Sequence, residues 1–231
     1  MADERMAQAA KPYTVTRSYD GKSADARRHE RRQQLLQTGI HMIGQNGYAD
    51  ASLNAICAQA GLSKRYFYES FDSVDALLTD AFLLISQDLQ QAVLSAIGGQ
   101  TTPAAMIRSG FRAFFEYLQA HPCRARVFLM EALSVQAVRS ELLGGGGGVV
   151  SPFLLATTLQ LLQTERLAEP VLNAMAQGAV GAAIFVGQNW IANGYTQPVE
   201  ELVQAVSEIC FGIAQRLDIP LDLPLESSKH S

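Results

Sequence analysis

The sequence predicts an all-α fold of about nine helices, and three observations favour this class. Apolar residues recur at the 3.6-residue period in several long segments, the polar and apolar alternation typical of strands is scarce, and 48% of the 231 residues are hydrophobic, which is enough for a buried core. We expect a flexible arm over residues 1–24, a small helical domain over 25–72, a larger domain over 73–219 and a tail over 220–231. The beginning of the fourth helix, to about residue 80, is shared between the two domains.

The small domain begins with one long helix, expected over residues 25–46. Leu35, Leu36, Ile40 and Ile43 recur at helical spacing, and an Asn-Gly pair then supplies a stop signal. The segment is therefore about five turns long.

Two short helices follow the long one. Ser52 is placed as the N-cap of a second helix over residues 53–60, which Gly61 ends. Ser63 is placed to cap a third helix over residues 64–71. A single glycine thus separates the two helices.

The third helix has one apolar face and one polar face. Phe67 and Phe71 are four residues apart and share a buried face. A helix this short gains little from its own hydrogen bonds, so this packing must hold it in place. The side chains left to face outward are Lys64, Arg65, Tyr66 and Tyr68.

These features follow the plan of a helix-turn-helix, in which the second short helix enters the major groove of DNA. Lys64 and Arg65 lie at the end of the helix that contacts base edges, and Arg to guanine is the commonest specific contact. Tyr66 and Tyr68 can offer a hydroxyl to phosphate or a ring to a thymine methyl. The residues alone leave open a plain basic surface hairpin.

The larger domain is predicted to contain six helices. Ser73 caps the first of them, and Pro103 suits the first turn of the next. Five consecutive glycines, Gly144–Gly148, disfavour a helix and predict a loop. The expected helices cover residues 74–97, 103–120, 123–136, 151–164, 170–193 and 199–217.

Charge and cysteine content exclude several classes of protein. Residues 1–72 carry 10 Lys and Arg against 8 Asp and Glu, whereas the whole chain has a net charge of −4, so the basic charge lies at the front. Three cysteines far apart form neither a disulfide framework nor a metal-ligand pattern, and no metal or cofactor is expected. We find no signal peptide or membrane span in the pattern, and we expect a cytoplasmic protein.

Residues 27–80 contain an ordered series of distinctive features. They are Leu35-Leu36, Gly47-Tyr48, Ser52, Ile56, the "AGLS" turn, Tyr68, Phe71 and Leu77-Leu78. In this order they resemble the N-terminal domain of the TetR family of bacterial transcriptional regulators.

The resemblance implies a role for several residues of the small domain. Ser52 and Tyr68 occupy positions that contact phosphate, while Lys64, Arg65 and Tyr66 face bases at the helix that Ser63 begins. Two residues depart from the family pattern: Arg65 replaces a small residue, and Val74 replaces the usual lysine at the start of the fourth helix. Val74 removes one expected phosphate contact, which Arg27, Arg28 or the basic arm would have to replace.

The resemblance also implies a homodimer formed through the last two helices. The segment Gly178–Gly187 is rich in small residues that let helices approach closely, and the last helix carries an apolar stripe. One short recognition helix contacts few base pairs, so specific binding to DNA requires two copies related by a two-fold axis. The expected interface residues are Gly178, Ala182, Phe185, Leu202, Val206, Ile209 and Ile213.

A pocket for a small, mainly hydrophobic effector is expected among helices four to eight. These helices contain many aromatic side chains that could line a cavity, although each one alone is better explained as core packing. Glu131 and Asn189 are the polar residues expected to face inward, where a ligand could pair with them. The expected lining comprises Phe82, Phe111, Phe115, Met130, Glu131, Asn189 and Trp190.

The sequence therefore predicts a ligand-responsive repressor that binds a palindromic operator as a dimer and is not an enzyme. Its four histidines are scattered, and no catalytic ordering of residues is recognisable. A redox-sensing regulator acting through Cys57 or Cys210 is an alternative. Two others are a helical enzyme or binding protein that has lost DNA function, and a non-specific nucleoid-type binder, which the net acidity disfavours.

Overall fold

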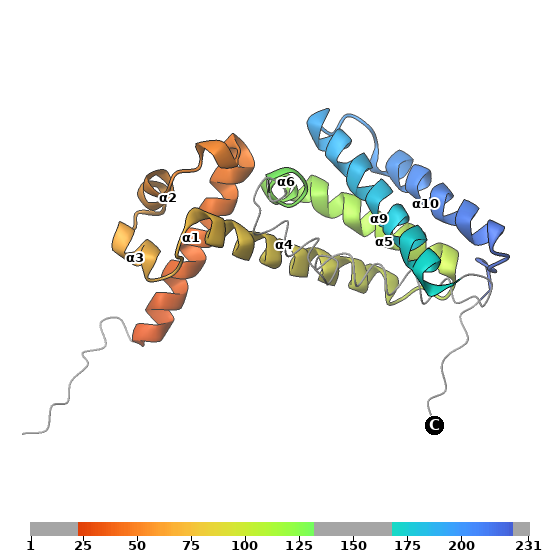
Figure 1. Ribbon diagram of the computed structural model, residues 1–231, viewed down its shortest axis with the longest axis horizontal. Coiled ribbons are helices and arrows are strands. Elements are labelled where there is room, and N and C mark those ends of the chain that lie inside the picture. The colour runs from red at the N-terminus through yellow and green to blue at the C-terminus, as the bar shows by residue number, and fades with distance from the viewer. Residues whose placement is uncertain (1–22, 132–167, 224–231) are drawn as a thin grey trace, which may run out of the picture.

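The computed structural model describes residues 23–131 and 168–223, and within these ranges the chain is all-helical. Eight α-helices, one short 3₁₀ turn and one π-helical segment are present there, with no strand. Helices α1, α2 and α3 gather at one end, and α4 runs from them along the larger body formed by α5, α9 and α10 (Figure 1). The predicted all-α fold, with a small N-terminal unit and a larger helical part, is confirmed.

Helix α1, Ala24–Asn46, begins and ends close to the predicted residues. The Ser23 hydroxyl accepts a hydrogen bond from the Ala26 N–H at 3.1 Å, which caps its first turn. Gly47 adopts φ 89° and its N–H donates to the Ile43 carbonyl, a backbone conformation that favours glycine. A 3₁₀ turn, Tyr48–Asp50, leads to the next helix.

The two short helices are α2, Leu53–Ala60, and α3, Lys64–Tyr68. Gly61 joins them with φ 64°. The predicted third helix extended to Phe71 and is three residues too long, because the chain tightens after Tyr68 and the Ser70 N–H bonds the Phe67 carbonyl instead.

The larger part is built on two long helices that lie against each other. Helix α4, Val74–Ile97, begins at the Ser73 cap, and α5, Pro103–Ala120, begins at the Thr102 cap with proline in its first turn. Helix α10, Val199–Arg216, packs on the other side of α5. Helix α9, Glu169–Ala192, completes this body.

The predicted sixth helix is divided in the structure. A short helix α6, Pro122–Arg126, continues as the π-helical segment η2, Val127–Glu131. The remainder of that prediction, together with the expected helix over 151–164, the Gly144–Gly148 loop and the terminal arm and tail, lies outside the described residues. Within them, no helix is both long and apolar enough to cross a membrane.

A single hydrophobic core runs through both parts of the molecule. It extends from Leu35, Ile56 and Phe67 in the small unit to Phe115 and Trp190 in the larger body. The core also contains Leu202 and Val206, which are 5% and 0% exposed. This corrects their predicted place in a dimer interface, because packing within the chain already covers both side chains.

Helices α1 and α6 approach closely and join the small unit to the larger body. A Cβ atom at Gly44 would lie 2.5 Å from the backbone of Cys123, so only glycine fits between these helices. The Glu131 carboxylate accepts the Tyr48 N–H at 2.9 Å and also pairs with the Arg126 guanidinium at 3.1 Å. These contacts therefore fix the orientation of the small unit, formed by α1, α2 and α3, relative to the segment that follows α5.

Candidate nucleic-acid interface

Helix α3 is anchored to the small unit by its phenylalanine side chains. Phe67 is fully buried and Phe71 is 4% exposed, with ring centroids 5.7 Å apart. Ile56 and Ala60 of α2 lie in the same core. The Gln34 amide also donates to the Ala60 carbonyl at 2.8 Å, which holds the end of α2 against α1.

The opposite face of α3 presents the four polar side chains to solvent. Lys64 is exposed, the Arg65 side chain is 85% exposed, and Tyr66 and Tyr68 are 36% and 61% exposed. The Tyr68 ring meets the Phe67 ring edge-on, with centroids 5.9 Å apart, so this ring is both packed against the core residue and largely exposed. The predicted division of this helix into a buried and an exposed face is confirmed.

The two serines that precede α2 and α3 differ in their contacts. Ser52 is exposed, and its hydroxyl accepts the Ala55 N–H at 3.1 Å while keeping its own proton to donate. Ser63 stands at the N-cap position, but its side chain makes no capping hydrogen bond in the described structure. The capping role predicted for the Ser63 hydroxyl is therefore wrong.

The basic cluster at the start of α1 has its members directed to different places. Arg28 is exposed and Arg27 is half-buried. The Arg31 guanidinium lies 4.3 Å above the Tyr66 ring and 3.9 Å from the Glu69 carboxylate. The sequence did not predict these contacts of Arg31. Glu69 also pairs with Arg65, and the four-residue spacing of that pair is a helical ion-pair pattern that the sequence does show.

Arg32 is used inside the small unit. Its guanidinium donates to the Ser70 carbonyl at 2.9 Å, pairs with the Asp80 carboxylate and lies 4.3 Å from the Phe71 ring. It therefore fixes the turn between α3 and α4. Val74, at the start of α4, is half-buried against the core and offers no polar group at the position where the resembling family has lysine.

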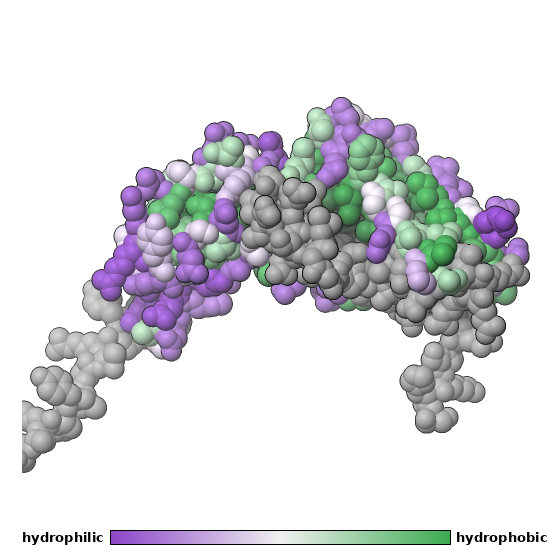
Figure 2. Space-filling model, in the orientation of Figure 1, coloured by the Kyte–Doolittle hydropathy of each residue, from purple (hydrophilic) through white to green (hydrophobic). Residues whose placement is uncertain are grey.

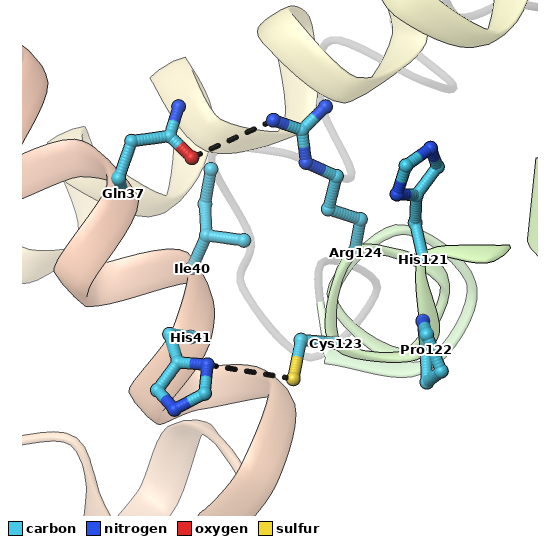
Figure 3. Close-up of a pocket in the computed structure, with 7 residues that line it drawn as sticks. All are labelled: Gln37, Ile40, His41, His121, Pro122, Cys123 and Arg124. Carbon is cyan, nitrogen blue, oxygen red and sulfur yellow. Dashed lines mark hydrogen bonds between the residues drawn. The ribbon is translucent and has the colours of Figure 1, made fainter.

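An open cleft of about 230 Å³ lies where α1 and α6 meet (Figure 3). Gln37, Ile40 and His41 approach it from α1, and His121, the N-cap of α6, approaches it with the first residues of α6, Pro122 to Arg124. The Arg124 guanidinium pairs with Asp88 and lies 3.5 Å from the Gln37 side-chain oxygen. None of the predicted effector-binding residues lines this cleft.

Those predicted residues occupy several different environments. Phe82 stacks on Phe128 with centroids 5.2 Å apart, Phe111 is half-buried, and Phe115 meets Trp190 edge-on. The Trp190 N–H is satisfied by the Gln197 carbonyl at 2.9 Å. Their role in binding an effector stays a prediction.

The three remaining members of that set do not face an aromatic interior. Met130 is exposed, and Asn189 is exposed and donates to the Phe185 carbonyl of its own helix. Glu131 turns towards Tyr48 and Arg126. The expectation that Asn189 points inward is wrong, because its side chain is exposed and bonds its own helix, whereas a role for Glu131 towards a ligand stays a prediction.

Apolar surface gathers over α9 in the larger body, whereas the end formed by α1 to α3 is largely hydrophilic on the same face (Figure 2). Phe185 and Ile209 are 65% and 45% exposed. Gly178 has open space at its missing side chain, and Ala182 and Ile213 are half-buried. These five predicted interface residues are accessible in the single chain.

The cysteine environments bear on redox chemistry. Burial raises the pKa of the Cys57 thiol, an effect that the nearby Lys64 opposes, and burial raises the pKa of Cys210 to about 11. Both thiols are therefore protonated at neutral pH. Among the described residues, no group of three or more His, Cys, Asp or Glu side chains is placed to hold a metal ion.

The chain resembles bacterial regulatory proteins in both sequence and fold. Residues 35–81 match the family model TetR_N, described as bacterial regulatory proteins of the tetR family. The HTH-type transcriptional repressor DhaR of Mycobacterium sp. (strain GP1) is 28% identical over 124 residues, which are 53% of this chain and 63% of DhaR. The alignment thus spans less than two thirds of that relative.

Solved structures share the fold over most of the chain. The fatty acid degradation regulator FadR from Bacillus halodurans is 19% identical, with a TM-score of 0.67 over 79% of this chain and 95% of its own. FadR from Bacillus subtilis, solved in complex with stearoyl-CoA, is 19% identical, with a TM-score of 0.66 over 77% and 96%. The chain therefore resembles the tetR family of bacterial regulatory proteins over residues 35–81 and shares the fold of these solved regulators.

Proposed function

We propose that this protein belongs to the TetR family and is a sequence-specific DNA-binding regulator of transcription whose helix α3 reads the major groove. The observation that carries the proposal is the outward presentation of Lys64, Arg65, Tyr66 and Tyr68 on a helix that Phe67 holds rigidly. A short, anchored helix with a basic outer face fits the groove of B-DNA.

The exposed groups divide by chemistry into base readers and phosphate binders. The Arg65 guanidinium can donate two hydrogen bonds to guanine O6 and N7, and Lys64 stands beside it at the N-terminal end of α3. The Tyr68 and Ser52 hydroxyls and Arg28 are suited to phosphate. Because Val74 at the start of α4 has no polar side chain, the phosphate contacts must come from these groups and from α1.

The proposal includes a homodimer that binds a palindromic site. The exposed Phe185 and Ile209, together with the open space beside Gly178, offer an apolar surface on α9 and α10 that a second copy could cover. One α3 helix contacts only a few base pairs. Two copies related by a two-fold axis place their α3 helices about 34 Å apart, one turn of DNA, and so recognise two half-sites.

We further propose that the protein is a repressor released by a small hydrophobic effector bound in the larger body. Similarity to the repressor DhaR supports the direction of regulation, and the neighbour solved with stearoyl-CoA supports an effector with a long apolar part. Helix α4 belongs to both parts, and the Glu131 carboxylate links η2 to Tyr48, so a shift in the body can reorient α3. To move the protein from 1:99 to 99:1 in favour of the released conformation, the effector must bind that conformation about 10⁴-fold more tightly than the DNA-binding one.

The geometry disfavours the redox alternative through Cys57 or Cys210. The thiolate is the reactive form, and burial keeps both thiols protonated at neutral pH. A DNA-binding role is also consistent with a cytoplasmic location and requires no cofactor or catalytic residue.

Selection of bound sequences from a random duplex pool, at fixed salt, tests the proposal. We expect enrichment of one palindromic site with half-sites about one helical turn apart. A folded protein that enriches no sequence would show that the DNA function has been lost, and that the larger body carries the activity.

A further inference from the structure

Glu69, immediately after α3, brings together two arginines from two helices. Its Oε1 atom lies 3.0 Å from Nε of Arg65, four residues earlier on α3, and its Oε2 atom lies 3.9 Å from Nη2 of Arg31 on α1. The Glu69 side chain is 28% exposed, whereas that of Arg65 is 85% exposed. The carboxylate thus lies at the base of the outer surface, and the Arg65 side chain extends from it into solvent.

Arg31 extends this set of contacts to a second residue of the outer face. Its guanidinium lies 4.3 Å from the centre of the Tyr66 ring, a cation–π arrangement. The Ser70 hydroxyl donates to the Tyr66 carbonyl at 3.0 Å, and the Glu69 N–H donates to the Arg65 carbonyl at 3.0 Å. The last turn of α3 is therefore fixed where Glu69 leaves it.

Protein stability does not account for this arrangement. An exposed ion pair four residues apart on a helix contributes little to folding, because solvent screens it and two long side chains lose freedom. The same loss of freedom matters in binding, because an arginine that is already oriented loses less conformational entropy when it contacts a base edge. On DNA that offers Arg65 no guanine, the Glu69 carboxylate also competes with phosphate for the Arg65 guanidinium, which weakens non-specific binding.

We propose that Glu69 is a positioning residue for sequence recognition: its carboxylate orients Arg65 for base reading and disfavours binding to DNA that offers Arg65 no guanine. This inference rests on the proposed DNA-binding function and adds to it the residue that separates specific from non-specific sites. Glu69 acts through Arg65 and makes no base contact of its own.

The test compares Glu69→Gln with the wild-type chain on the selected operator and on a scrambled duplex at the same salt concentration. We expect Glu69→Gln to bind the scrambled duplex more tightly and the operator no better, so that the ratio of the two affinities falls about tenfold. In an Arg65→Ala background the substitution should no longer change this ratio beyond about twofold, because the residue through which it acts is missing.

Asp72→Asn is the matched control. Asp72 is exposed three residues further along the chain, and within the described structure it forms no ion pair with Arg31 or Arg65. Its removal should raise both affinities alike and leave their ratio unchanged. Thermal melts of all variants would show that the fold is retained, as expected for exposed residues.

Two results would overturn the inference. One is an equal change of both affinities in Glu69→Gln, which would make Glu69 a simple electrostatic repulsor like Asp72. The other is an unchanged effect of Glu69→Gln in the Arg65→Ala background. Failure of the wild-type chain to select any sequence is a separate result: it would remove the proposed function itself, and this inference with it.

Discussion

At the scale of single residues, the exposed side chains of α3 were predictable and their mutual contacts were not. Helical spacing alone separates Phe67 from Lys64, Arg65 and Tyr68, because residues four apart share a face. The cation–π contact of Arg31 with Tyr66 depends on how α1 crosses α3, which no local pattern encodes. A tertiary placement, and not a motif, brings such pairs together.

The partners of Glu131 could not be predicted for the same reason. A carboxylate within the apolar stretch "VFLMEAL" suggested an inward group awaiting a ligand. Its partner is instead the N–H of Tyr48, 83 residues earlier in the chain. A buried acceptor needs a donor, but the sequence does not say which donor will be near.

Tyr68→Phe should weaken binding to every DNA sequence alike. In the proposed complex the Tyr68 hydroxyl contacts phosphate, so its loss should remove about 1 kcal/mol of binding free energy from operator and scrambled duplex equally. The ring contact with Phe67 is kept, and the free energy of unfolding should not change. Titration of both duplexes with the variant checks this, and weakening confined to the operator would show that Tyr68 reads a base.

At the scale of elements, caps and breakers predicted most boundaries. Ser52 and Ser73 accept the N–H groups expected of N-caps, and Gly61 adopts the left-handed conformation that ends α2. The end of α3 was missed because nothing in "KRYFYESF" marks a stop. Tertiary contacts, including the bond from Arg32 to the Ser70 carbonyl, decide it.

Gly44→Ala should test the contact between α1 and α6. Alanine favours a helix by about 1 kcal/mol over glycine, but its Cβ would lie 2.5 Å from the Cys123 backbone, which cannot yield as a side chain tip can. Overpacking of this kind costs about 1–3 kcal/mol, so we expect a net loss of stability or a separation of the two helices.

Gly110→Ala is the control for that change. A Cβ at Gly110 would lie 3.4 Å from the Ile97 side chain, an ordinary contact, so helix propensity should decide and the variant should be at least as stable as the wild type. Chemical denaturation of both variants gives the comparison. Equal stability of the two would show that α1 and α6 do not press on each other at Gly44.

At the scale of the whole molecule, the sequence indicated a small N-terminal helical part and a larger helical part, and both are present. It did not reveal which apolar residues of α10 serve the core of the chain and which stay accessible. Leu202 and Val206 lie in the core and are buried, whereas Ile209 is exposed. All these apolar residues of α10 follow the same helical spacing, so the sequence alone does not separate buried ones from exposed ones. The position of the neighbouring helices decides which of them are buried.

Phe185→Glu should give a folded monomer with weak operator binding. The side chain is 65% exposed, so the charge costs the single chain little, but it would be buried without a partner in an interface of two copies. Analytical ultracentrifugation gives the mass. Leu94→Glu, which introduces the same charge at a half-exposed site on α4, should remain dimeric, and a dimeric Phe185→Glu protein would place the interface elsewhere.

The most direct test of the account is to select bound sequences from a random duplex pool with the wild-type chain and the Arg65→Ala variant in parallel. We predict that the wild type enriches a palindrome and that Arg65→Ala loses preference at one symmetric pair of positions, with about 1–3 kcal/mol weaker binding to the original site. The same motif from both proteins would contradict base reading by Arg65. No motif from either would contradict sequence-specific DNA binding by this chain.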